Sequence, residues 1–61
     1  MRPLLDLSYE ELQDELTSWG EPRYRARQVA EWALRRGVTD FGAMTNLPPA
    51  LRTRLAEAFT L

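Results

Sequence analysis

The sequence contains no cysteine and no histidine, and these two absences exclude several kinds of site. Without cysteine the chain can form no disulfide, no thiolate nucleophile and no cysteine-ligated metal centre. Without histidine it lacks the commonest general base and the commonest nitrogen ligand for metals. Lysine is absent too, so all eight basic residues are arginine.

Long apolar runs are also missing, and none approaches the ~20 residues that a membrane-spanning helix needs. The acid Asp6 interrupts the N-terminus too early for a signal peptide. With 61 residues, of which 44% are hydrophobic, the chain is near the lower limit for independent folding. We expect one cytoplasmic, monomeric globular domain over residues 1–61, with no membrane partner.

The charges are strongly segregated along the chain, although the net charge is only −1. Residues 6–21 hold six acids and no base, whereas residues 22–39 hold five arginines and the single acid Glu31. The remaining residues, 40–61, are neutral overall. Since a partner meets the local charge rather than the net charge, the basic segment indicates an anionic partner.

Two long helices are predicted in the first half of the chain. Ser8 and Glu11 have the spacing of a capping box, and Leu12, Leu16 and Trp19 continue as an apolar stripe that ends before Gly20. Pro22 prevents this helix from continuing. The second helix is expected from Pro22 or Arg23 to Arg36, with Gly37 as its stop.

The second half predicts a short helical turn and a third helix. The turn is expected from Asp40 to Met44 with Thr39 as its cap, and the helix opens at Leu47-Pro48-Pro49. Leu51, Leu55 and Phe59 would form its apolar stripe. Because no alternating strand pattern occurs, we predict an all-α fold, a small bundle of three main helices plus one short helix.

The connection between the first two helices is similar to a helix-hairpin-helix element. Gly20, Ala26 and Val29 match the spacing of that element, whose Gly-x-Gly turn offers backbone amides to phosphate. Pro22 takes the place of the second glycine and has no N–H to donate. Arginine side chains would therefore carry more of any phosphate binding.

Three arginines, Arg23, Arg25 and Arg27, are placed at the start of the second helix, where cations are unfavourable. A helix N-terminus carries roughly half a positive charge, so each cation there costs up to about 1 kcal/mol. An RNA or DNA backbone would compensate for this, and a solvated arginine-rich face is the alternative. Tyr24 lies among these arginines and could stack on an unpaired base or pack beneath the first helix.

Other candidate groups are expected to be structural. The carboxylate pairs Glu10/Asp14 and Glu11/Glu15 have helical spacing and are interpreted as a solvated face, since acid–base work would require a pocket. The hydroxyl groups have no basic partner to activate them. Core packing is expected for four aromatic residues on apolar stripes, Trp19, Trp32, Phe41 and Phe59.

Several short sequence runs together carry a resemblance to a known family. They are Leu4-Leu5-Asp6-Leu7, Gly20-Glu21-Pro22-Arg23-Tyr24-Arg25-Ala26-Arg27-Gln28-Val29, Trp32, Arg36-Gly37-Val38, Asp40-Phe41-x-x-Met44-Thr45-Asn46-Leu47 and Leu51-Arg52. The chain closely resembles, over nearly its whole length, the N-terminal accessory domain of the bacterial dual-specificity RNA methyltransferases. The related adenine-C8 resistance methyltransferases carry a similar leader. Pro48-Pro49 departs from the more polar helix cap usual in the family.

The resemblance implies an accessory domain rather than an enzyme. In this family a radical S-adenosylmethionine barrel, absent here, holds a 4Fe-4S cluster and methylates adenine C2 in large-subunit ribosomal RNA and transfer RNA. No cofactor is expected in this chain itself. RNA and the catalytic barrel of the same protein are the implied partners, and a docking or purely structural helical module is the alternative. The residues implied to bind RNA are Arg23, Tyr24, Arg25, Arg27, Gln28, Arg35 and Arg36.

Overall fold

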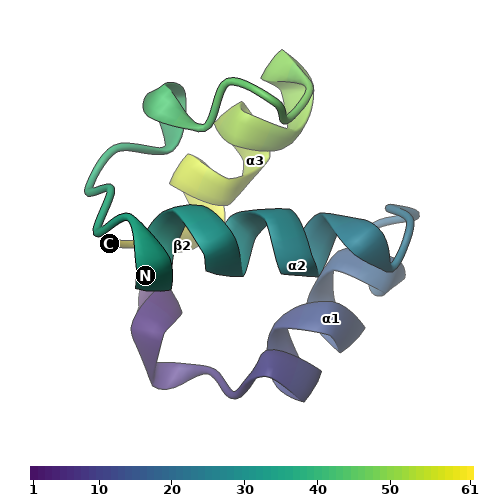
Figure 1. The fold of residues 1–61 in the computed structure, drawn as a ribbon. Coiled ribbons are helices and arrows are strands. Elements are labelled where there is room, and N and C mark those ends of the chain that lie inside the picture. The colour runs from purple at the N-terminus through teal and green to yellow at the C-terminus, as the bar shows by residue number, and fades with distance from the viewer.

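The computed structural model describes all 61 residues, Met1–Leu61, and one helix crosses the middle of the molecule (Figure 1). The elements in chain order are β1 (Arg2–Pro3), the 3-10 turn η1 (Leu4–Asp6), α1 (Tyr9–Ser18), α2 (Tyr24–Ala30), the π-helical η2 (Glu31–Arg35), the 3-10 turn η3 (Phe41–Ala43), α3 (Pro49–Ala58) and β2 (Phe59–Thr60). In Figure 1, α1 lies below α2 and α3 lies above it. The predicted bundle of three main helices plus one short helix is confirmed.

Helix α1 has the predicted cap and the predicted stop. The Glu11 backbone N–H donates to the Ser8 hydroxyl oxygen at 3.1 Å, and the Ser8 backbone N–H donates to Glu11 Oε1 at 2.8 Å. After the helix, Gly20 has φ 87°, in the left-handed region that favours glycine. The Glu21 N–H then donates to the Leu16 carbonyl at 3.0 Å, which closes the helix end.

The second helix differs from the expected regular α-helix at its first residue and in the geometry of its second half. It begins at Tyr24, and it widens into a π-helix over Glu31–Arg35, where the Arg36 N–H donates to the Glu31 carbonyl at 3.2 Å. Gly37 has φ 62° and ends the helix as predicted. An apolar stripe continues through either kind of turn, so the sequence pattern did not distinguish them.

The predicted cap of the short turn was wrong. Asp40, not Thr39, caps η3, because Asp40 Oδ1 accepts from the Gly42 backbone N–H at 2.9 Å. Asp40 is one residue closer to Gly42 than Thr39 is, so its carboxylate accepts from the Gly42 amide and the Thr39 hydroxyl does not cap the turn. Helix α3 begins at Pro49, where proline at the first helical position costs no hydrogen bond.

A small parallel pairing of β1 with β2 was not predicted. Arg2 pairs with Phe59 and Pro3 with Thr60, so Phe59 lies in a strand rather than on the α3 stripe. Two-residue strands are too short to show an alternating pattern in the sequence. The pairing brings the first and last residues side by side, as the N and C labels in Figure 1 show.

The hydrophobic core is formed by residues from every helix and from β2, and it contains no polar side chain. Its twelve members are Leu4, Leu12, Leu16, Ala26, Val29, Ala33, Phe41, Met44, Leu47, Leu51, Leu55 and Phe59. Core packing is thus confirmed for Phe41 and Phe59, whereas Trp19 and Trp32 are only half-buried against the core. None of the helices combines the length and the apolar character required to cross a membrane.

Candidate nucleic-acid interface

Arg25 is the one of the three misplaced arginines that the fold itself compensates. Its side chain is only 17% exposed, and its Nε lies 3.6 Å from Glu21 Oε1. Its Nη1 donates to Gln28 Oε1 at 2.9 Å. A carboxylate just before the helix therefore balances this cation, and Arg25 fixes the hairpin between α1 and α2.

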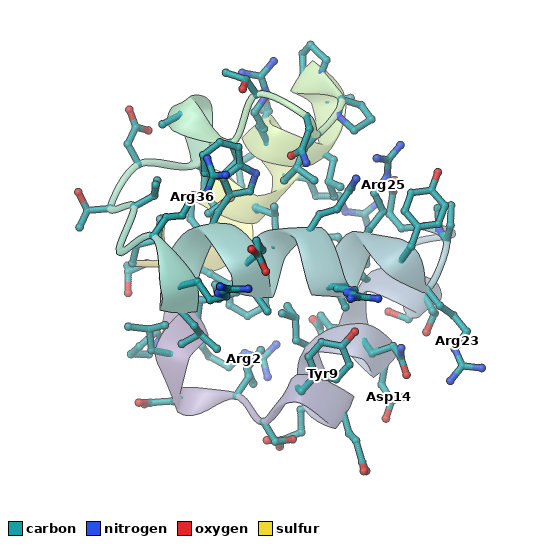
Figure 2. All side chains as sticks on the ribbon, viewed as in Figure 1. Arg2, Tyr9, Asp14, Arg23, Arg25 and Arg36 are labelled. Carbon is teal, nitrogen blue, oxygen red and sulfur yellow. The ribbon has the colours of Figure 1, made fainter.

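Arg23 and Tyr24 are exposed at the hairpin end of α2. The Tyr24 side chain does not pack beneath α1: the residue is 55% exposed, and the Arg25 guanidinium lies 4.8 Å from its ring centroid. Arg23 points away from the body of the molecule (Figure 2), and its Nη2 donates to Gln13 Oε1 at 3.3 Å. The two side chains present a cation and an aromatic ring to solvent.

The remaining arginines of this helix differ in how they are held. Arg27 is exposed and makes no hydrogen bond or ion pair within the chain. Arg35 is exposed, and its Nη1 lies 3.4 Å from Oε1 of Glu31, one turn earlier in the helix. The Arg36 guanidinium lies 4.8 Å from the ring centroid of Trp32. Arg27 is therefore the cation most available to a ligand.

A polar hollow joins three of the predicted site residues. Arg27, Gln28 and Arg35 line it together with Glu31 and Asn46, and no apolar residue contributes. Asn46 comes from the segment after η3, where its Oδ1 accepts from Trp32 Nε1 at 2.7 Å. The predicted residues thus fall into two groups, Arg23, Tyr24 and Arg25 at the hairpin end and Arg27, Gln28 and Arg35 at this hollow, while Arg36 lies over the Trp32 ring outside the hollow.

Asn46 and Trp32 are the site residues that sequence reasoning missed. Trp32 was interpreted as core; it is half-buried against the core, and its indole also lies beside the Arg36 guanidinium and holds Asn46 through its N–H. Asn46 is the only asparagine of the chain and lies within the Met44-Thr45-Asn46-Leu47 run that carries the family resemblance. The presence of Asn46 in that run was the sequence signal that could have indicated a role for this residue in the site.

The acidic residues of α1 are used for capping and ion pairing. The backbone N–H of Ser8, with help from its hydroxyl, lowers the pKa of Glu11 below its ordinary value of 4.5. Glu15 Oε1 lies 3.0 Å from Arg2 Nη2. Asp14 points away from α2 in Figure 2. Three of the four paired carboxylates, Glu10, Glu11 and Asp14, are exposed, which agrees with the solvated-face interpretation, and no acid of α1 forms an ion pair with an arginine of the second helix.

A separate apolar groove lies between the start of α1 and the α2–η2 helix. Leu5, Tyr9 and Leu34 line it, and all three are exposed, Leu34 to 69%. Elsewhere, no three acidic side chains gather closely enough to hold a metal ion. The surface of the domain therefore offers a basic, polar face and an apolar groove.

The chain is similar to known proteins over nearly its whole length. The profile described as "Ribosomal RNA large subunit methyltransferase N-terminal domain" matches residues 3–61. The chain is 49% identical over 61 residues to "Probable dual-specificity RNA methyltransferase RlmN" of Thermotoga neapolitana, covering all of this chain and 18% of that protein. It is 44% identical to "Dual-specificity RNA methyltransferase RlmN" of Nitratiruptor sp., again over the whole chain and 16% of the relative.

A solved structure is similar over the same span. The crystal structure of a radical SAM methyltransferase from Sphaerobacter thermophilus matches with a TM-score of 0.93 and 46% identity, covering 100% of this chain and 18% of that one. The chain thus spans less than one fifth of the length of these relatives. It belongs to the ribosomal RNA large subunit methyltransferase N-terminal domain family.

Proposed function

We propose that this chain is the RNA-engaging accessory domain of a radical-SAM methyltransferase that methylates adenine C2 in large-subunit ribosomal RNA and transfer RNA. The relatives carry the name of dual-specificity RNA methyltransferases, which favours this parentage over the adenine-C8 enzymes. In this role the domain holds the substrate and does not react with it. We place its action in the cytoplasm, where these RNAs are found.

The observation that carries this proposal is the accumulation of accessible cations along one helix. Arg27 and Arg35 are exposed on α2 and η2, and Arg23 and Arg36 are exposed at the two caps of this helix. Arg27 has no partner in the chain. Tyr24 adds an exposed ring, which suits stacking on an unpaired base. Asp14 of α1 points away from this helix (Figure 2), so its charge does not face RNA bound there. Arg25, the enclosed member of the predicted set, would position the hairpin.

The chemistry of the parent would lie outside these 61 residues. A 4Fe-4S cluster needs cysteine ligands, and this chain has neither cysteine nor histidine. The residues present here do not fit a cluster, and no reaction step is assigned to them. S-adenosylmethionine and the cluster would belong to the catalytic barrel.

Salt dependence of RNA binding tests the proposal. We expect the chain to bind a single-stranded RNA weakly, with each phosphate contact contributing about −0.7 to the log–log slope of affinity against salt. Replacing Arg23, Arg27 and Arg35 together by alanine should remove most of the affinity and flatten the slope by about 2. Fluorescence anisotropy with a labelled oligonucleotide measures both quantities.

Arg54→Ala on α3 is the control for the single change Arg27→Ala. Arg54 is also exposed, lies 4.6 Å from the Trp19 ring centroid and is outside the predicted RNA-binding set. This variant should bind RNA as the unmodified chain does. No binding by the unmodified chain at low salt would contradict the proposal, as would full binding by the triple variant.

The apolar groove supports a second role, docking on the remainder of the parent. An exposed groove lined by Leu5, Tyr9 and Leu34 is costly to leave in water, and large exposed apolar side chains that cluster mark interaction sites. The occupant we assign is the catalytic barrel, since the domain accounts for only 16–18% of the length of the relatives and the resemblance assigns the barrel to the remainder. RNA would then lie against the arginines while the barrel covers the groove.

A further inference from the structure

The polar hollow beside α2 and η2 has a composition unlike that of the rest of the surface. Its lining residues are Arg27, Gln28, Glu31, Arg35 and Asn46, each with a side chain that can form hydrogen bonds. Four of them come from one helix, and Asn46 comes from a segment separate in sequence. A ligand placed here would therefore contact two parts of the fold at once.

The hydrogen bonds within the chain fix which way the two amides face. Gln28 Oε1 accepts from Arg25 Nη1 at 2.9 Å, and Asn46 Oδ1 accepts from Trp32 Nε1 at 2.7 Å. Each amide therefore has its oxygen directed to a partner in the chain, whereas the two N–H donors on each amide nitrogen have none. Both amides are held as donors toward a ligand.

The charged groups add to this excess of donors. Arg27 contributes guanidinium N–H groups that no residue of the chain accepts. Arg35 is the other cation, and Glu31, at 3.4 Å from it, is the single carboxylate. The hollow thus carries one net positive charge, and its one strong acceptor already faces an arginine.

A ligand that satisfies such a site must offer acceptors and negative charge. The phosphodiester group does so, because its two free oxygens accept hydrogen bonds and donate none. A base edge usually mixes donors with acceptors, so it would leave part of this donor set unpaired. The arrangement favours the RNA backbone over a base as the occupant.

We propose that this hollow seats one phosphodiester group of RNA, an inference that rests on the RNA-engaging function above. Arg27 and the amide nitrogens of Gln28 and Asn46 donate to the phosphate oxygens. Trp32 acts as a positioning residue, since its N–H holds Asn46 in the donating orientation. Glu31 limits the affinity, because its carboxylate engages Arg35 and repels the phosphate.

Two substitutions of similar size should change RNA affinity in opposite directions. Asn46→Asp keeps an acceptor for the Trp32 N–H but replaces the donors by a carboxylate, so we expect affinity about tenfold weaker. Glu31→Gln removes the repelling charge and releases Arg35, so we expect affinity about threefold tighter. Fluorescence anisotropy of the 61-residue chain with oligo(A) and oligo(U) RNA measures both, and circular dichroism checks that each variant is folded.

Matched controls separate the hollow from a general effect of charge. Thr53→Asp and Glu57→Gln make the same charge changes on exposed positions of α3. Each should shift affinity less than the corresponding change in the hollow. The effect of Asn46→Asp should be equal for oligo(A) and oligo(U), and an effect confined to one of them would indicate a base site and overturn the proposal.

The outcomes also distinguish this inference from the function on which it rests. If the unmodified chain binds no RNA, both are contradicted. If it binds RNA with the expected salt slope but neither Asn46→Asp nor Glu31→Gln differs from its control, only the phosphate seat is contradicted. Because Glu31→Gln predicts a gain of affinity, a partly unfolded variant cannot imitate the expected result.

Discussion

Neighbouring arginines of one helix have different physical roles in this domain. Arg25 is enclosed and has Glu21, Gln28 and the Tyr24 ring as partners. Arg27, two residues later, has none within the chain. The unfavourable interaction of a cation with the start of α2 is thus offset within the chain for Arg25, by Glu21, and is not offset for Arg27.

We expect Arg25→Ala to destabilise the domain more than Arg27→Ala. Loss of the Arg25 ion pair, hydrogen bond and packing should lower the free energy of unfolding by about 1 kcal/mol. Arg27→Ala should change it by less than about 0.5 kcal/mol, because no contact is lost. Urea denaturation followed by tryptophan fluorescence measures the difference, and equal losses would show that the Arg25 contacts contribute nothing.

At the scale of elements, the cap of α1 and the two glycine stops were better predicted than the π-helical turn and the cap of η3. The capping box at Ser8 and the stops at Gly20 and Gly37 depend on one or two residues with a distinct chemistry, and the sequence shows them directly. The π-helical geometry of η2 could not be predicted in this way, because no single residue type marks the turn that widens. The cap of η3 was misassigned because Thr39 and Asp40 are adjacent and both able to cap.

The capping box of α1 predicts a defined response to pH. Its hydrogen bonds lower the pKa of Glu11 in the folded chain, so the stabilisation is complete above the ordinary value of 4.5 and is lost as the pH falls through the lower folded value. Glu11→Gln should remove this part of the acid sensitivity. Thermal unfolding of the unmodified chain and of the Glu11→Gln variant, followed from about pH 7 to about pH 3, measures the difference in acid sensitivity.

The hydroxyl half of the same box gives a control for that experiment. Ser8→Ala removes the acceptor for the Glu11 N–H and should cost about 1 kcal/mol at neutral pH. If Glu11→Gln leaves the fall of stability in acid unchanged, the carboxylate has no part in the cap in solution.

For the whole molecule, the sequence predicted the helical bundle, the apolar stripes of α1 and α3 and, by its charge, the basic face. It did not predict that Asn46 would lie beside Arg27 and Arg35, because that contact depends on how the segment after η3 folds back on the helix. The pairing of β1 with β2 was missed for a related reason. Both are contacts between residues distant in sequence, which local patterns do not encode.

If the apolar groove docks on the catalytic barrel, a substitution in the groove should have an effect in the full-length protein that it does not have in the isolated chain. Leu34→Asp should alter the stability of the isolated chain by less than about 0.5 kcal/mol, because this side chain is mostly in water. In a full-length methyltransferase carrying this domain, the same change would place a charge in the covered groove and loosen the domain. Limited proteolysis of the full-length protein should then release the domain faster, and Glu57→Gln provides the unaffected control. An unchanged rate for Leu34→Asp would mean that the groove stays uncovered.

The pairing of β1 with β2 also has a mechanical consequence. Since the two strands are parallel, a pull that separates the chain ends slides one strand along the other and loads the inter-strand hydrogen bonds in shear. The buried Phe59 ring anchors the same strand in the core. A tether attached after Leu61 would therefore transmit force to the whole domain before it could peel the last strand away.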